Sequence, residues 1–280
     1  MKIFLSVLTL FLCVNTSRAH HGSGGGYSFS ANGSQNTFCL PKNQWLLINQ
    51  NGYQLFDHGG MTDGFQMLNA FQSELTIGYG ISNKVNLFVL SGASVLNSEN
   101  DQFLSMKTVG GRVLYNAISK KNLKGNFSFQ VDGPTSYFNQ ESPFWALRFQ
   151  LSAQTFLMHK NWTLSANYNF PIAEDQSYDL GKQLESKITY QYNLTRSDSA
   201  DAKWSIEPGV RVLSIGKTYN DNKVVFNTGS DQLLLSASVN LFHQKRWGFS
   251  WIIEKPVWQY VVGNQSTTNL NTYCTIYLRL

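Results

Sequence analysis

Charged residues are scarce in this sequence, which narrows the kind of surface the protein can have. Asp, Glu, Lys and Arg make up 14% of the 280 residues, where soluble globular domains carry about 25%. The net charge of +5 is not gathered in any long run, and basic pairs such as Lys120-Lys121 are short. Because nucleic-acid-binding proteins show a basic patch or stripe, we expect no nucleic-acid partner.

Cysteine is scarce as well, and long apolar runs and catalytic motifs are missing. The chain has three cysteines and no C-x-x-C spacing, which excludes a disulfide scaffold and the common zinc and redox motifs. After residue 19, no apolar run approaches the roughly 18 residues that a membrane helix needs. His58 lies beside Asp57, a pair that could act as a general base, but no serine or cysteine nucleophile stands in a recognisable motif nearby. We therefore expect no helical anchor, no enzyme activity and no cofactor.

The start of the chain has the pattern of an export signal. A basic residue, the apolar stretch Ile3–Val14 and the small-x-small sequence Ser17-Arg18-Ala19 follow one another, as in a secretory signal peptide. We expect residues 1–19 to be this signal. Residues 20–36 are rich in Gly, Ser and His and should form a flexible tail, and residues 37–280 should form the folded domain.

Most of the remaining chain alternates between apolar and polar residues, and 14% of the sequence is aromatic. The last stretch, Asn269–Leu280, alternates to its end, with Cys274 and Ile276 on one face and Tyr273 and Thr275 on the other. A transmembrane β-barrel pairs its last strand with its first, so that no backbone edge faces lipid. This ending resembles the C-terminal strand by which bacterial outer-membrane barrels are recognised by the barrel-assembly machinery, although a terminal Leu stands where most of them carry Phe.

Alternating segments recur along the chain, and we interpret them as twelve antiparallel strands. Their expected ranges are 44–55, 70–80, 85–95, 104–117, 125–132, 144–157, 162–170, 183–195, 203–215, 231–241, 246–255 and 269–280. An even number of strands places both chain ends on one side of a barrel. Outer-membrane barrels have short periplasmic turns and longer outer loops. We accordingly expect short connections such as Ile81–Lys84 to alternate with long ones such as 96–103 and 256–268.

A soluble all-β domain would also show alternation, so the choice depends on several features together. One face of nearly every expected strand carries large apolar or aromatic residues, whereas the opposite face is polar. The export signal and the apolar terminal residue also favour a membrane protein. The sequence predicts an all-β fold, a transmembrane antiparallel up-and-down β-barrel of about twelve strands, surrounded by lipid in the bacterial outer membrane.

Short motifs in the first third of the chain resemble a known family. They are His20-His21-Gly22 with a glycine run, Leu40-Pro41-Lys42 followed by Trp45, and Tyr79-Gly80-Ile81-Ser82. They are similar to a family of proteobacterial outer-membrane barrels that is associated with the meta-pathway of phenol degradation, or simply with transport. The resemblance implies an outer-membrane location and a role in the passage of small molecules. It implies no catalytic residues.

The polar faces of the expected strands would point into the barrel lumen. The charged residues that we place there are Glu74, Arg112, Asp132, Arg148, Glu185, Lys187, Glu207, Arg211, Glu254 and Arg279. Either they pair with one another and hold the interior together, or some of them face a water-filled channel and tune its selectivity. Twelve strands enclose more space than eight and less than the sixteen of open porins, so we expect a narrow or partly plugged path.

Two functions of different classes fit this pattern. The first is an outer-membrane channel or transporter for small solutes, hydrophobic or aromatic compounds among them, through a narrow polar lumen. The second is a non-conducting barrel that acts in binding or metal sensing through its tail. If cleavage follows Ala19, the amino group and imidazole of His20 could bind copper or zinc together with His21. No third ligand is identifiable, and a small polar junction that suits the signal peptidase explains the same residues.

Cys39 and Cys274 lie far apart in sequence, but closure of a barrel would bring the first and last strands together. Cys274 is six residues before the terminus, about 20 Å above the periplasmic end of the last strand at 3.3 Å per residue. Cys39 precedes Pro41 and should lie at or below the start of the first strand. A disulfide needs Cα atoms within about 7 Å. We expect two free thiols, with Cys274 facing lipid; a disulfide would mean that the first strand begins near Cys39.

Overall fold

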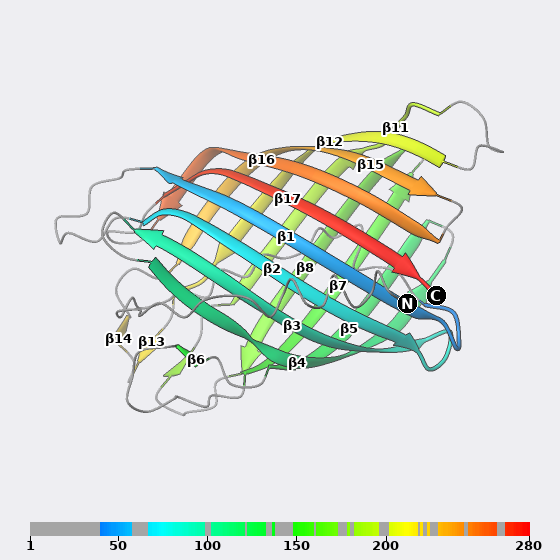
Figure 1. Ribbon diagram of the computed structural model, residues 1–280, viewed down its shortest axis with the longest axis horizontal. Coiled ribbons are helices and arrows are strands. Elements are labelled where there is room, and N and C mark those ends of the chain that lie inside the picture. Colours follow the sequence, from blue (N-terminus) through cyan, green and yellow to red (C-terminus); the bar gives the residue numbers. More distant parts are fainter. Residues whose placement is uncertain are drawn as a thin grey trace, which may run out of the picture.

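All regular structure in the described part of the protein is β-structure (Figure 1). The computed structural model describes residues 40–57, 67–98, 102–120, 122–132, 136–137, 148–159, 161–172, 178–179, 182–195, 202–217, 219–220, 223–224, 229–243, 246–261 and 267–280. Within these ranges, no helix is long and apolar enough to cross a membrane.

Twelve long strands in these ranges form the wall of the molecule. They are β1 (Trp45–Asp57), β2 (Met67–Gly80), β3 (Val85–Ser98), β4 (Gln102–Ser119), β5 (Leu123–Asp132), β7 (Arg148–His159), β8 (Trp162–Ile172), β10 (Gln183–Tyr190), β12 (Ala202–Ile215), β15 (Ser230–His243), β16 (Trp247–Val261) and β17 (Thr267–Arg279). The short strands are β6 (Ser136–Tyr137), β9 (Tyr178–Asp179), β11 (Tyr192–Asn193), β13 (Tyr219–Asn220) and β14 (Lys223–Val224). Most bounds of the long strands lie within four residues of the predicted ones.

The long strands close into a ring. Each pairs antiparallel with the long strand before it and the one after it, β1 pairs with β17, and β10 pairs with β12. A closed ring leaves no row of unpaired backbone groups, which is the condition for crossing lipid with strands. The predicted all-β, antiparallel, up-and-down barrel of twelve strands is confirmed.

Both ends of the described chain lie at one end of the barrel (Figure 1). Trp45 N donates to Leu280 O, and Leu280 N donates to Trp45 O, each at 3.0 Å. The tight turn Ile81–Lys84 between β2 and β3 lies at the same end, which we call the short-turn end. Cys274 lies opposite Asn51 on β1 and is a free thiol, as predicted, whereas Cys39 lies outside the described residues.

The connections between strands alternate between short and long less regularly than predicted. The predicted long connection 96–103 is wrong, because β3 and β4 continue until only residues 99–101 separate them. The connection between β10 and β12 spans residues 191–201 at the short-turn end and contains β11. Strands that run past the membrane shorten the outer loops, so loop length alone was an unreliable guide to the end at which a connection lies.

The predicted loop 256–268 is also wrong, because β16 runs through Pro256 to Val261. Leu233 of β15 pairs with Trp258, but Leu234 pairs with Pro256, which marks a shift in register. Proline lacks the backbone N–H that a regular ladder needs, and a bulge is one of the few places in a sheet that accommodates it. Only residues 262–266 connect β16 to β17.

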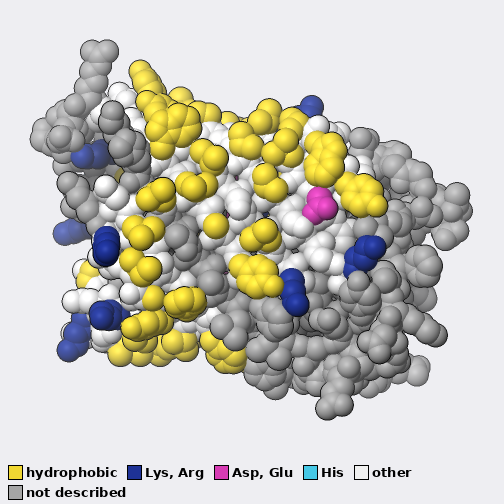
Figure 2. All heavy atoms as spheres, turned by 180° about the vertical axis from the view of Figure 1, so that it is seen from behind, with side chains coloured by type: hydrophobic (Ala, Val, Ile, Leu, Met, Phe, Trp, Pro, Cys, Tyr) yellow, Lys and Arg dark blue, Asp and Glu magenta, His cyan; other side chains and the backbone are white. Residues whose placement is uncertain are grey.

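The outer face of the barrel is apolar. Figure 2 shows apolar side chains spread over the described wall on one side of the molecule. Exposed apolar residues occur around the ring and include Val89, Phe127, Leu164, Ile188, Val210, Leu235, Trp251 and Ile276. A water-soluble domain rarely exposes a continuous apolar patch of this extent. On a closed barrel, such a surface is the one that faces lipid.

Aromatic side chains gather at the short-turn end of this apolar surface. Trp45 at the start of β1 contacts Tyr79 near the end of β2, with ring centroids 4.6 Å apart. On β16, Trp247 lies at this end and Trp258 lies eleven residues further along. Eleven residues span about 36 Å of strand and about 28 Å of barrel height at a tilt of about 40°. The two tryptophans therefore bracket a band close to the roughly 25 Å expected between aromatic girdles.

Candidate functional site

The inner face of the barrel is polar over most of its area. Its buried neutral residues are Gln50, Gln54, Gln72, Thr76, Asn86, Asn116, Asn126, Ser128, Gln183, Ser205, Ser236, Ser238, Asn240, Ser250, Thr268, Asn271 and Thr275. Several bond across strands: Gln54 Nε2 donates to Thr268 Oγ1 at 2.7 Å, and Ser250 Oγ donates to Asn240 Oδ1 at 2.6 Å. Other parts of the protein, and not bulk water, cover these side chains.

Four charged side chains meet on one side of the lumen and form what we call the charge belt: Glu185 and Lys187 on β10, Arg211 on β12 and Glu254 on β16. One guanidinium nitrogen of Arg211 donates to Glu254 Oε2 at 2.7 Å, and another donates to Glu185 Oε2 at 3.2 Å. Arg211 Nε lies 3.1 Å from Glu185 Oε1. The planar fork of arginine suits two carboxylates at once.

Lys187 completes the belt from the neighbouring strand. It is the register partner of Arg211, and its Nζ lies 3.8 Å from Glu254 Oε1. Glu207, four residues before Arg211 on β12, interacts electrostatically with Lys187. Two adjacent cations therefore lie among three carboxylates, and each cation has at least one carboxylate beside it.

The tilt of the strands brings side chains of the charge belt together although their strands are not all neighbours in the ring. Arg211 pairs in register with Leu234 of β15, and Glu254 pairs with Ser236 of the same strand. The ion pair between Arg211 and Glu254 therefore reaches across β15, which lies between their strands. Ser236 is small and leaves room for this crossing. Glu254 is 0% exposed, and loss of one partner from such a buried pair typically costs about 3–5 kcal/mol.

The structure does not bring the other charged residues of the predicted set into the belt. Arg112 on β4 lies over the ring of Phe88, with Cζ 4.8 Å from the ring centroid. Arg279 lies at the short-turn end, opposite Leu46. Asp132 and Arg148 face each other in the register of β5 and β7, and their side chains lie outside the described part of the chain.

An apolar group inside the short-turn end was not foreseen from the sequence. This apolar cluster consists of Leu40, Leu46, Phe88, Leu90 and Leu114. Leu40 precedes β1 and is fully buried, because the chain turns at Asn43, which has a φ of 65°. A signal existed in β3, where Leu87-Phe88-Val89-Leu90 is apolar on both faces, as expected of a strand buried on both sides.

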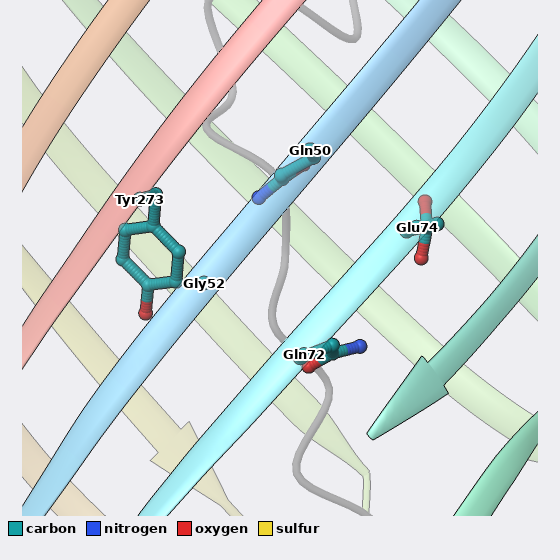
Figure 3. Close-up of a pocket in the computed structure, with 5 residues that line it drawn as sticks. All are labelled: Gln50, Gly52, Gln72, Glu74 and Tyr273. Carbon is teal, nitrogen blue, oxygen red and sulfur yellow. The ribbon is translucent and has the colours of Figure 1, made fainter. Parts of the chain in front are cut away.

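A pocket lies in the wall of the lumen (Figure 3). It is lined by Gln50 and Gly52 of β1, Gln72 and Glu74 of β2, and Tyr273 of β17. Gly52 is the register partner of both Tyr273 and Gln72, so its missing side chain leaves a gap between them. Glu74 accepts a hydrogen bond from Thr76 Oγ1 at 3.3 Å.

Tyr273 connects this pocket to the charge belt. Its side chain is buried and interacts with Arg211. Tyr273 comes from β17 and Arg211 from β12, with β15 and β16 between them in the ring. Tyr273 therefore takes part in both the pocket and the surroundings of Arg211.

In the described ranges, no group of three or more His, Cys, Asp and Glu side chains is arranged to hold a metal ion. His20 and His21, the predicted metal ligands, and His58, considered as a general base, all lie outside these ranges. Metal binding by the tail stays a prediction.

Comparison with known proteins identifies the fold of the chain. No protein-family model matches the chain, and no sequence of a curated protein does. The chain is similar to the crystal structure of an outer-membrane channel from Pseudomonas putida F1, with a TM-score of 0.58, 12% identity, and coverage of 86% of this chain and 97% of that one. It has the fold of a bacterial outer-membrane β-barrel.

More distant likenesses are to other barrels of this kind. The NanC porin has a TM-score of 0.47 at 9% identity, covering 84% of this chain and 100% of that one. The translocator domain of the autotransporter NalP from Neisseria meningitidis has 0.48 at 13% identity, covering 88% and 92%. These values are too low to indicate what the present barrel carries.

Proposed function

We propose that the chain forms an outer-membrane channel through which small solutes pass along a narrow polar lumen. One observation carries this proposal: the closed barrel is apolar outside, yet its interior bears amides, hydroxyls and the charge belt. An interior that served only to fill space could be apolar throughout, as it is at the apolar cluster. A polar interior is typical of barrels that conduct water and solutes.

The width of the lumen limits the solute. Inner side chains such as Gln50 and Glu254 are buried, which supports a path narrower than that of sixteen-stranded porins. A solute in such a path must exchange part of its hydration for hydrogen bonds to the wall. We extend the proposal to hydrophobic or aromatic compounds, because Phe88 and its neighbours give the short-turn end an apolar wall.

Swelling of proteoliposomes tests this proposal. Vesicles containing the folded protein should swell faster than empty vesicles in arabinose, and much less in the larger raffinose. Uptake of labelled phenylalanine, an aromatic solute that carries no net charge, into the same vesicles tests the extension to aromatic compounds. Protein that was unfolded by heat before reconstitution is the control. Swelling no faster than in the control would contradict the channel and favour a barrel that only binds.

We also propose that β17 is the segment that the barrel-assembly machinery recognises. Its alternating pattern and its pairing with β1 support this role. In cells, Leu280→Asp should reduce the amount of assembled barrel severalfold. Thr267→Asp, the same change of charge at the other end of β17, should reduce it much less. Equal loss in both variants would contradict recognition through the end of the strand.

A further inference from the structure

The pocket lined by Gln72 and Glu74 contains a buried hydrogen-bond acceptor that the described residues leave unused. Gln72 is 4% exposed, and its Oε1 has no hydrogen-bond partner among the described residues. Figure 3 shows Gln72 and Glu74 side by side on β2, with Gln50 and Tyr273 on the neighbouring strands. A buried acceptor without a partner is unfavourable, so the pocket is suited to a ligand that brings donors.

Glu74 differs from the carboxylates of the charge belt. Glu185 and Glu254 each contact a cation, whereas Glu74 takes part in none of the ion pairs within the described ranges. Its one hydrogen bond from this part of the chain comes from Thr76, at 3.3 Å. Glu74 therefore contributes a negative charge that the described wall leaves uncompensated.

We propose that this pocket binds the ammonium group of a small organic cation. A primary ammonium has N–H donors for both the Glu74 carboxylate and the unpartnered amide oxygen of Gln72. Its charge balances that of Glu74. Gly52 leaves the gap in which such a group fits, and the rest of the cation would extend into the lumen. As a statement about the transported solute, this inference rests on the proposed channel function.

An anion would be disfavoured in the same pocket. Arg211, the cationic side chain with which Tyr273 interacts, already contacts two carboxylates. A negatively charged ligand would also lie against Glu74, which repels it. The arrangement thus selects by charge and by the number of N–H donors.

Calorimetric titration of the folded barrel in detergent with ethylammonium chloride tests the inference. We expect saturable binding that Glu74→Gln weakens about tenfold or more, because a hydrogen bond to a charged group is lost. Glu207→Gln is the matched control: it removes a carboxylate on β12, outside the pocket, and should change the affinity less than twofold. Tetramethylammonium, which has the charge but no N–H donors, should bind at least tenfold more weakly.

A second variant covers the case in which Glu74→Gln does not fold, as judged by heat-modifiable migration. Gly52→Val fills the gap and should abolish ethylammonium binding while leaving the carboxylate in place. Absence of binding to the unchanged protein, or equal binding by the folded variants, would overturn the inference. Binding that behaves as expected in a protein that conducts nothing would support the pocket and contradict only the channel.

Discussion

The charge belt and the apolar cluster stabilise two regions of the same barrel interior in different ways. In the apolar cluster, Leu46, Phe88 and Leu114 are held by contacts whose strength depends on volume and burial. In the charge belt, Arg211 and Glu254 are held by directional contacts whose loss leaves a charge buried alone. The apolar cluster presents only apolar contacts to the lumen, whereas the belt and the nearby amides present charges and hydrogen-bonding groups.

The largest expected effect comes from breaking the charge belt. Arg211→Met keeps much of the side-chain volume but leaves Glu185 and Glu254 without the guanidinium, and should lower the free energy of unfolding by about 3–5 kcal/mol. Urea unfolding from lipid vesicles, followed by tryptophan fluorescence, measures it. Adding Glu254→Gln to Arg211→Met should restore part of the loss. A double variant as unstable as the sum of its single changes would show that the pair does not act as one unit.

The apolar cluster should respond to volume instead of charge. Leu114→Ala should cost about 3 kcal/mol, because it removes buried methyl groups and leaves a cavity, while Leu114→Met should cost less than about 1.5 kcal/mol. The same unfolding experiment applies. Leu114 and Arg211 lie on different sides of the barrel, so Leu114→Ala and Arg211→Met should add. Strong coupling between them would mean that the interior is not divided in this way.

An arginine placed one residue before Arg211 tests the difference between the inner and outer faces of the barrel. Val210 precedes Arg211 on β12 and faces outward, 41% exposed. It lies six residues beyond Trp204, about 15 Å along the barrel axis at a tilt of about 40°. Val210→Arg should therefore cost about 2 kcal/mol or more near the bilayer centre. Val210→Thr, similar in shape and uncharged, should cost less than about 1 kcal/mol; equal effects in the unfolding assay would refute the lipid-facing orientation.

Loss of a hydrogen bond between neutral side chains in the lumen should have the smallest effect on stability. Thr268→Val removes the acceptor of the 2.7 Å hydrogen bond from Gln54 Nε2, and should cost about 1–2 kcal/mol because a buried donor is left unpaired. Replacing both residues, with Gln54→Leu added, should cost less than the single change. A loss as large as that of Arg211→Met would mean that charge does not distinguish the belt from the amides around it.

The barrel itself could be predicted because side chains along a β-strand point alternately to its two faces, with a period of two residues. On β17, Tyr273 and Thr275 are buried inside while Ile276 is exposed outside, as the alternation indicated. The twelve strands followed from the same pattern. Loop lengths were predicted less well, because Pro256 was taken as the end of a strand when a bulge accommodates it.

The contacts between side chains inside the lumen could not be predicted from the alternation of apolar and polar residues. Arg211 meets Glu254 across β15 and not its register neighbour Leu234, and such a contact depends on tilt and stagger that no single strand encodes. The apolar cluster was missed for another reason: a polar inner face was assumed for every strand. Phe88 and Leu90, which alternate with the outward Leu87 and Val89, show that β3 departs from this assumption.

Single-channel recording in a planar bilayer tests the central claim, that the polar interior is a path through the membrane, most directly. Purified folded protein in potassium chloride should give discrete conductance steps, smaller than those of a sixteen-stranded porin because the lumen is narrower. Glu74→Gln should shift the selectivity of these steps towards anions. Persistent silence from protein shown to be folded and inserted would contradict the account.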